Sequence, residues 1–227
     1  MENCHIRDLS RIDHTYTPGV LLDGVGNRIE YNEVFDVLLE SDDQGGADMF
    51  GDPTYRGNSY RHNWWHHIGN WSGSGSGENP GCGQAGIRLD DAICGVLIEG
   101  NVFQKCSAGG LGFGGVQIHG GKENIVDGNL FLDCAAAISF SPWGEGRWKE
   151  YVREALAKPA IDRDLYLKRY PTLARLSERN DANHVWRNVA ERCGRRDRVD
   201  RSRVRTYNAV HDTPDQTSSV EGPRGAP

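Results

Sequence analysis

The chain has 227 residues, 37% of them hydrophobic, and a formal net charge of −6. This length allows one domain with a sizeable core, and the acidic balance argues against nucleic acid as a partner, because nucleic-acid surfaces are basic. No segment approaches the roughly 20 apolar residues of a membrane span, so we expect no membrane partner. The 29 glycines follow no strict triplet period, which indicates a β architecture rich in turns rather than collagen.

An internal repeat begins near the N-terminus. A motif that recurs about every 20 to 50 residues indicates a solenoid. Five segments align on Asn32, Asn63, Asn101, Asn129 and Asn188, and NCHIRDL at the start fits through Asn3. A second short strand also recurs, as GVLLDG (19–24), GADMFG (46–51), GIRLDD (86–91), GVQIHG (115–120) and AISFSP (137–142). Its apolar residues alternate with other types at period two, as in half-buried strands.

The spacing of the repeat predicts the fold class. Asn32 to Asn63 spans 31 residues and Asn101 to Asn129 spans 28, which suits three short strands per coil. We therefore predict an all-β, right-handed parallel β-helix of the pectate-lyase type over residues 1–193, with N-terminal rungs missing. Ile87, Val116 and Ile138 are expected to stack inside it.

Asparagine and cysteine recur at fixed places in this repeat. Buried amides stacked at successive corners would satisfy the backbone groups exposed there. Cys106, Cys134 and Cys193 each follow their repeat asparagine by five residues, in register with Val37 and Ile68. No CxxC pair occurs, so we expect a buried column of thiols and neither a metal site nor a cofactor.

Three segments depart from the repeat. The Gly/Ser-rich stretch at 69–84 is expected to be a mobile loop over one face. Residues 145–178 read as a helical insertion packed outside the solenoid, because Trp148, Val152 and Leu156 recur at helical spacing. Residues 194–227 are basic and then poor in apolar residues, which predicts a disordered tail.

Stacking the second strands predicts a polar cluster. Their outward positions form two columns, Leu21, Asp48, Arg88, Gln117, Ser139 and, beside it, Asp23, Phe50, Asp90, His119, Ser141. Rungs lie about 4.8 Å apart, so the backbones of Asp48 and Asp90 should lie roughly 8 Å apart on a diagonal. Asp91 falls one position later, where Gly24, Gly51, Gly120 and Pro142 stand, so we expect it to shape the corner or support Asp90.

Two carboxylates at this spacing are typical of glycoside hydrolysis. We take Asp48 and Asp90 as the catalytic pair, without assigning retention or inversion, and an oligosaccharide or polysaccharide as the substrate of a monomer. Expected substrate-binding residues are Arg88, Asp91, Gln117, His119, Ser141 and Trp143. Trp143 could instead seal the insertion against the solenoid. The structural alternative is a solvated ladder of cross-rung pairs, Asp48 with Arg88 and Asp90 with His119.

The segments DDQGGADMFGDPTYRGNSYRHN, AGIRLDDAICGVLIEGNVF, GGVQIHGGKENIVDGNLFLDCAAAISF and YLKRYPTLARL resemble bacterial right-handed parallel β-helix repeat proteins. They are similar to glycoside hydrolases of family 141, which include α-L-fucosidases and xylanases. The resemblance implies one catalytic carboxylate at the position of the Asp90–Asp91 pair and another on the preceding rung, where Asp48 fits. It also suggests a secreted or periplasmic protein, although residues 1–25 contain no signal-peptide pattern.

Other readings stay open. A polysaccharide lyase would use a basic residue and a cation or arginine, for which Arg88, Arg61, Asp42 and Asp43 supply the residue types. Polygalacturonases are similar in having an Asp, an Asp pair and a His–Gly on successive rungs. A non-catalytic carbohydrate-binding solenoid is the third reading.

Overall fold

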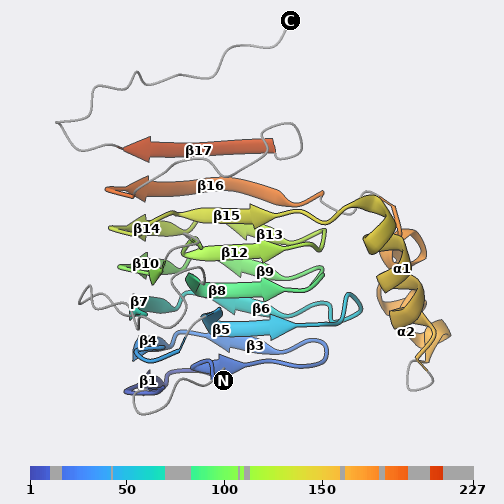
Figure 1. Ribbon diagram of the computed structural model, residues 1–227, viewed down its shortest axis with the longest axis horizontal. Coiled ribbons are helices and arrows are strands. Elements are labelled where there is room, and N and C mark those ends of the chain that lie inside the picture. The colour runs from blue at the N-terminus through green and yellow to red at the C-terminus, as the bar shows by residue number, and fades with distance from the viewer. Residues whose placement is uncertain are drawn as a thin grey trace, which may run out of the picture.

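The computed structural model describes residues 1–10, 17–41, 43–69, 83–106, 108–109, 113–158, 162–178, 182–193 and 205–211. Within these ranges the chain is mostly strand, and the strands pair in parallel except where β11 (Ala108–Gly109) meets β8. Two α-helices, α1 (Glu145–Leu156) and α2 (Arg163–Arg169), and the 3₁₀ helix η1 (Pro171–Arg175) complete the described elements. The architecture is of the parallel β-solenoid type (Figure 1).

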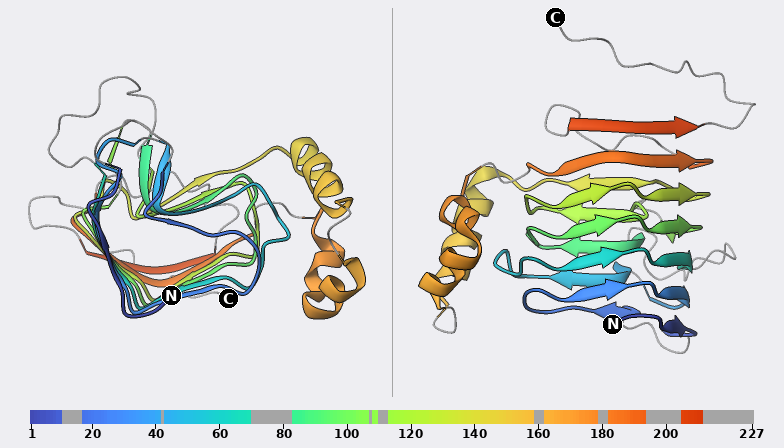
Figure 2. Two further views of the ribbon diagram at one scale, coloured as in Figure 1. Left: turned by 90° about the horizontal axis from the view of Figure 1, so that it is seen from below. Right: turned by 180° about the vertical axis from the view of Figure 1, so that it is seen from behind.

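The strands form three stacks. The first contains β1 (His5–Arg7), β4 (Glu33–Val37), β7 (Trp64–Ile68), β10 (Val102–Gln104) and β14 (Leu130–Leu132). The second contains β3 (Arg28–Glu30), β6 (Ser59–Arg61), β9 (Leu97–Glu99) and β13 (Ile125–Asp127). The third contains β2 (Val20–Leu21), β5 (Gln44–Phe50), β8 (Gly83–Asp90), β12 (Val116–His119) and β15 (Ile138–Ser141). Seen along the stacking direction, the three stacks surround a common interior (Figure 2).

Strand β16 (His184–Glu191) joins the first two stacks. Its first half pairs with β13 and its second half with β14, so the two stacks belong to one 11-stranded sheet, while the third stack forms a 6-stranded sheet. Strand β17 (Arg205–His211) then pairs in parallel with β16. The sequence predicted a disordered tail from residue 194, whereas RTYNAVH continues the parallel pairing; the other residues of that range lie outside the described part.

The predicted asparagine ladder is present. Each amide Nδ2 donates to the Oδ1 of the next ladder asparagine at 2.9–3.0 Å along Asn32, Asn63, Asn101, Asn129 and Asn188. The same Oδ1 atoms accept backbone N–H groups of the preceding rung. The side chains are at most 3% exposed, so the ladder satisfies backbone groups that water does not reach.

The first rung corrects one detail of the alignment. His5 is in register with Glu33, so Cys4 and not Asn3 faces Asn32, and the Cys4 N–H donates to Asn32 Oδ1 at 3.0 Å. Asn3 lies one residue earlier in the left-handed region, with φ 54°, like Tyr31 on the next rung. The short opening segment offers few apolar positions to fix its register.

A second ladder lies five residues before the first and was not predicted from the sequence. Asn27 donates to Asn58 Oδ1 at 3.0 Å, and Asn124 donates to Asn183 Oδ1 at 3.0 Å. Val96 occupies the position between these two pairs, and its N–H donates to Asn124 Oδ1 at 3.1 Å. The constant five-residue offset is the sequence signal that would have revealed this ladder.

The interior is apolar, as the alternation predicts. Ile87 and Val116 are buried and in register, and Ile138 is paired with Val116 and packs half-buried against the same core. Cys106 and Cys134 are buried in that core with Val37 and Ile68, and Cys193 packs against it, so the thiol column is confirmed. One set of alternate side chains in the third stack therefore points to the interior, so the other set points away from it.

The helical insertion packs outside the stacks, where both views of Figure 2 place it. Trp148 and Val152 are buried against Ala92 and Cys94, which follow β8, and the Trp148 indole N–H donates to the Leu176 carbonyl at 3.0 Å. None of the described helices is long and apolar enough to cross a membrane.

Lys122 ties the end of the insertion to the solenoid, which gives a first prediction. Its side chain is buried, and Nζ donates to the carbonyls of Arg175 and Glu178. Lys122→Met keeps the length but leaves two carbonyls without a donor, so we expect local opening to become easier by about 2 kcal/mol. Limited proteolysis of residues 145–178 should then accelerate more than tenfold. The exposed Lys149→Met is the matched control, and equal cleavage rates for both variants would contradict the prediction.

Candidate functional site

The register brings the predicted columns together. Asp48 pairs with Leu21 on one side and Arg88 on the other, and Gln117 pairs with both Arg88 and Ser139. In the neighbouring column Phe50 pairs with Asp90, and His119 with Ser141. The period-two alternation and the rung alignment thus placed these side chains correctly relative to one another.

Asp90 lies at the centre of a charged cluster. Its Oδ1 is 2.7 Å from His119 Nδ1, and its Oδ2 is 2.9 Å from Arg88 Nη2. An ionised carboxylate only accepts hydrogen bonds, so His119 Nδ1 carries the donated proton and Nε2 is left for other contacts. Arg88 also pairs with the Asp43 carboxylate at 3.0 Å, and its guanidinium lies 5.3 Å from the centroid of the Phe113 ring.

Asp48 lies deeper than the sequence predicted. We expected it at an outward position, but it is 6% exposed, and its Oδ2 accepts the Gly45 N–H at 3.0 Å. The backbone bends sharply there: a Cβ on Gly45 would lie 2.2 Å from the Ala47 carbonyl oxygen and 2.7 Å from the Arg88 nitrogen. Only glycine fits this bend, which folds the start of β5 over the carboxyl group.

The two carboxyl groups differ in protonation. Burial raises the pKa of Asp48 to about 8, although the charge of Arg88 and the Gly45 N–H oppose the shift. Burial would also raise the pKa of Asp90, but the hydrogen bond from His119 and the charge of Arg88 outweigh it and hold this pKa below its usual value. At neutral pH Asp48 is therefore mostly protonated and Asp90 is ionised, the division of roles that acid–base catalysis uses.

Asp91 occupies the corner after β8. It has a positive φ of 42°, as do its counterparts Gly24, Gly51 and Gly120 with 85°, 82° and 66°. Its Oδ1 lies 3.5 Å from His119 Nδ1 and 3.4 Å from Arg147 Nη2 on α1. Asp91 thus both shapes the corner and touches the imidazole that serves Asp90.

Trp143 seals the insertion against the solenoid and is no exposed platform for a sugar. It is 4% exposed, its ring meets His119 edge-on at 5.8 Å between centroids, and the Arg147 guanidinium lies 3.5 Å from its ring centroid. Tyr151 covers it further at 5.0 Å. Of the two sequence interpretations of Trp143, the seal is the one observed, because both the insertion and the solenoid need their apolar surface covered.

The remaining predicted contacts are mostly buried. The Gln117 amide donates to Ser141 Oγ at 3.5 Å, and Ser139 Oγ accepts the Gly114 N–H at 2.9 Å. Gln117 is 2% exposed, whereas Ser141 is partly exposed. The column of Asp48, Arg88 and Gln117 therefore underlies the site, and the neighbouring column of Asp90, His119 and Ser141 is its accessible part.

The sequence analysis placed neither Asp43 nor Arg147 beside the proposed catalytic pair. Asp43 was named only for the lyase reading, yet it holds the other side of Arg88. Arg147 was hidden in the insertion, and its place four residues after Trp143 is the only sequence signal that links it to the site. The loop predicted at 69–84 falls largely outside the described residues, and Asp42 falls wholly outside them.

Of the residues that suggested a lyase, Arg88 and Asp43 lie together at 3.0 Å, Arg61 lies apart from them, and Asp42 is outside the described residues. Arg61 belongs to the second stack, where it pairs with Glu99 at 2.8 Å. Arg88 pairs with the carboxylates of Asp43 and Asp90. An arginine guanidinium only donates hydrogen bonds, so it is a poor candidate for the base of an elimination.

Asp90, Asp91 and His119 are the one group in the described residues with ligand atoms close enough for a metal ion, all within 4.8 Å of one another. Arg88 and Arg147 already pair with its two carboxylates. Their positive charges oppose a bound cation, so the group is better suited to polar hydrogen bonding with a substrate.

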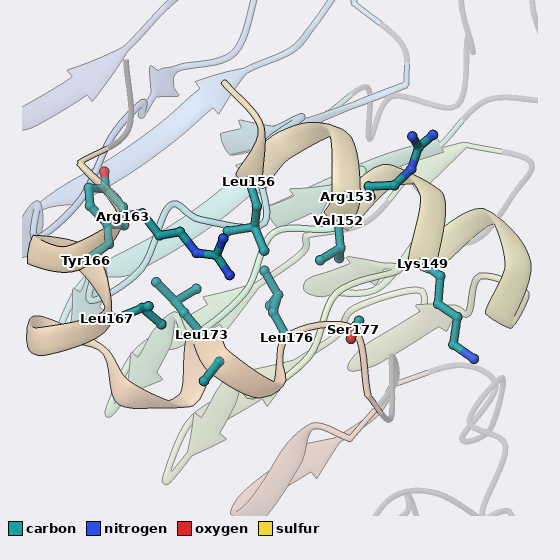
Figure 3. A pocket seen from close by; sticks show the side chains of 11 residues that line it. Lys149, Val152, Arg153, Leu156, Arg163, Tyr166, Leu167, Leu173, Leu176 and Ser177 are labelled. Atoms are coloured by element: carbon teal, nitrogen blue, oxygen red, sulfur yellow. The ribbon is translucent and has the colours of Figure 1, made fainter. Parts of the chain in front are cut away.

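A cavity of about 270 Å³ lies within the insertion and away from this cluster. Residues of α1, α2 and η1 line it, among them Val152, Leu156, Leu173 and Leu176, as Figure 3 shows. None of Asp48, Asp90 and His119 contributes to its wall.

The pKa of Asp48 makes a second prediction. The folded protein binds the Asp48 proton up to about pH 8, whereas the unfolded chain releases it near pH 4, so Asp48 weakens the fold as pH rises between these values. Asp48→Asn removes this dependence. The stability of the variant relative to the parent should rise by about 1.4 kcal/mol per pH unit between pH 5 and 7 in urea titrations. The exposed Asp23→Asn is the control, and a difference for Asp48→Asn that stays constant with pH would refute the prediction.

Comparison of the chain with protein-family models, with curated proteins and with solved structures finds no match in any of the three.

Proposed function

We propose that the chain is a right-handed parallel β-helix glycoside hydrolase with Asp48 and Asp90 as its acid–base pair. The handedness follows from the general rule that connections between parallel strands of one sheet are right-handed. The three strands per coil and the continuous asparagine ladder support a β-helix of this type.

One observation carries the functional proposal: adjacent rungs hold two carboxyl groups whose pKa values are shifted in opposite directions. Arg88 links them, because it shares the rung of Asp90 and is in register with Asp48. Asp48 is the proton donor to the leaving oxygen, and Asp90 is the base or nucleophile. His119 and Arg88 orient the Asp90 carboxylate. Asp91 lies beside His119, and Ser141 is in register with His119 on the next rung. The bond broken joins a sugar carbon to oxygen, and water supplies the new hydroxyl.

A specific observation favours a second candidate, a non-catalytic carbohydrate-binding solenoid. Asp48 is buried, and both oxygens of Asp90 already have partners, so the acids could serve only to hold the fold. The hydrolase proposal requires the substrate to reach Asp48 past the β5 bend. The binding proposal requires no such access.

Product analysis tests the proposal. The purified chain is incubated with a panel of aryl glycosides and of plant and algal polysaccharides. Hydrolysis yields saturated reducing ends, elimination yields an unsaturated ring, and a binding module yields neither. Saturated ends that depend on Asp90 support the hydrolase; unsaturated products, or binding without cleavage, overturn it.

A further inference from the structure

His119 faces two carboxylates with a single nitrogen. Nδ1 is 2.7 Å from Asp90 Oδ1 and 3.5 Å from Asp91 Oδ1. One N–H forms one strong hydrogen bond, so the two aspartates compete for the imidazole. A small rotation of the Asp91 side chain would place it within full bonding distance, and Asp90 would then lose its donor.

Arg147 reaches the same oxygen of Asp91 from the insertion. Its Nη2 is 3.4 Å from Asp91 Oδ1, and its Cζ lies 3.5 Å from the centroid of the Trp143 ring. Trp143 in turn packs edge-on against His119. Stacking on the ring limits where the guanidinium can lie, so its contact with Asp91 has a defined direction although the pair is partly exposed.

We infer that Arg147 is a positioning residue: it holds Asp91 away from His119, so that the imidazole stays on Asp90. The helical insertion thereby becomes part of the site and is more than a cover for the solenoid. The catalytic meaning of this contact rests on the proposed hydrolase function, but the contact itself does not.

A test must separate the effect of the Arg147 charge from the effect of releasing Asp91, so the charged groups around His119 matter. Asp90 contacts it from β8 and Asp91 from the corner, while Arg88 of β8 and Arg147 of α1 pair with these two carboxylates. Tyr151 of α1 lies behind Trp143. Removing Arg147 raises the pKa of Asp90 in two ways, by the loss of a nearby positive charge and by the release of Asp91 to take the imidazole. Only the second depends on Asp91.

Carboxyl ¹³C NMR titration of Asp90 in the folded, substrate-free protein tests the inference. We expect Arg147→Gln to raise the pKa of Asp90 by roughly half a pH unit or more, Arg147→Lys to restore most of the parent value, and Lys149→Gln on the same helix to change little. In an Asp91→Asn background the effect of Arg147→Gln should be clearly smaller, because only the loss of the positive charge remains.

An effect of the same size with and without Asp91 would reduce Arg147 to a general charge, and no effect at all would also overturn the inference. Because the titration needs no substrate, this failure is distinct from a failure to find hydrolysis. Arg147 is exposed and lies outside the apolar cluster of the insertion, so these variants are expected to fold.

Discussion

Replacing Asp90 by Asn is expected to lower the turnover of an identified glycoside substrate by about 10²–10⁴-fold, the size of a lost acid–base or nucleophilic group. The amide keeps the volume of the carboxyl group but cannot be ionised, so it serves neither as base nor as nucleophile. It also presents one oxygen where the carboxylate accepts from both His119 and Arg88. A modest loss of stability is therefore expected beside the large loss of turnover.

Initial rates with saturating substrate, together with a binding isotherm, separate the two effects. Asp90→Asn should still bind the substrate, whereas Asp23→Asn, an exposed aspartate of the same column, should match the parent in rate. Asp48→Asn should also lose turnover, since its amide cannot donate the proton. If Asp90→Asn and Asp48→Asn both hydrolysed the substrate as fast as the parent, the assignment would be wrong.

The same assignment fixes the shape of the pH profile. Activity needs Asp90 ionised and Asp48 protonated, so the rate should fall at low pH as Asp90 gains a proton and fall again above about pH 8 as Asp48 loses its own. A rate that kept rising through pH 9 would exclude Asp48 as the acid. The profile therefore tests Asp48 without any substitution.

Local sequence pattern was enough to place the columns of the third stack. Alternation at period two fixes which residues share a face, and the repeat asparagines fix which rung each strand occupies, so Asp90 and His119 were brought together correctly. The helical insertion was located in a similar way, because Trp148 and Val152 recur at a spacing that puts them on one face of a helix, and both are buried there.

The burial of Asp48 could not be read from the same pattern. An alternation rule assigns a residue to a face, but the bend at Gly45 folds β5 onto that face, and whether a glycine bends or merely spaces the chain depends on the neighbouring rung. The contact of Arg147 with Asp91 could not be predicted either, because it also depends on tertiary packing. It joins residues 56 apart through the packing of α1, and no local period records that packing.

Removing the central amide of the first ladder, by Asn101→Ala, is expected to cause the largest loss of stability. Asn101 is 1% exposed; its Oδ1 accepts the Asn63 N–H at 3.0 Å, and its Nδ2 donates to the Tyr60 carbonyl at 2.9 Å. Alanine leaves the buried Asn63 N–H without its acceptor, at about 1–3 kcal/mol, and takes one donor from the Tyr60 carbonyl. The amide bonds to Asn63 and Asn129 are lost as well, so we expect a total of about 3–5 kcal/mol in urea unfolding.

Asn27→Ala is the matched control, because Asn27 ends the second ladder and is partly exposed. Both the side-chain amide and the backbone N–H of Asn27 donate to Asn58 Oδ1. The backbone N–H still donates to this oxygen after the change, so we expect a loss of stability below about 1 kcal/mol. Asn101→Ser, which restores one short polar group, should fall between the two and gives a folded variant if Asn101→Ala does not fold. Equal losses for Asn101→Ala and Asn27→Ala would show that position in the ladder does not matter, and that these amides only fill space at the corners.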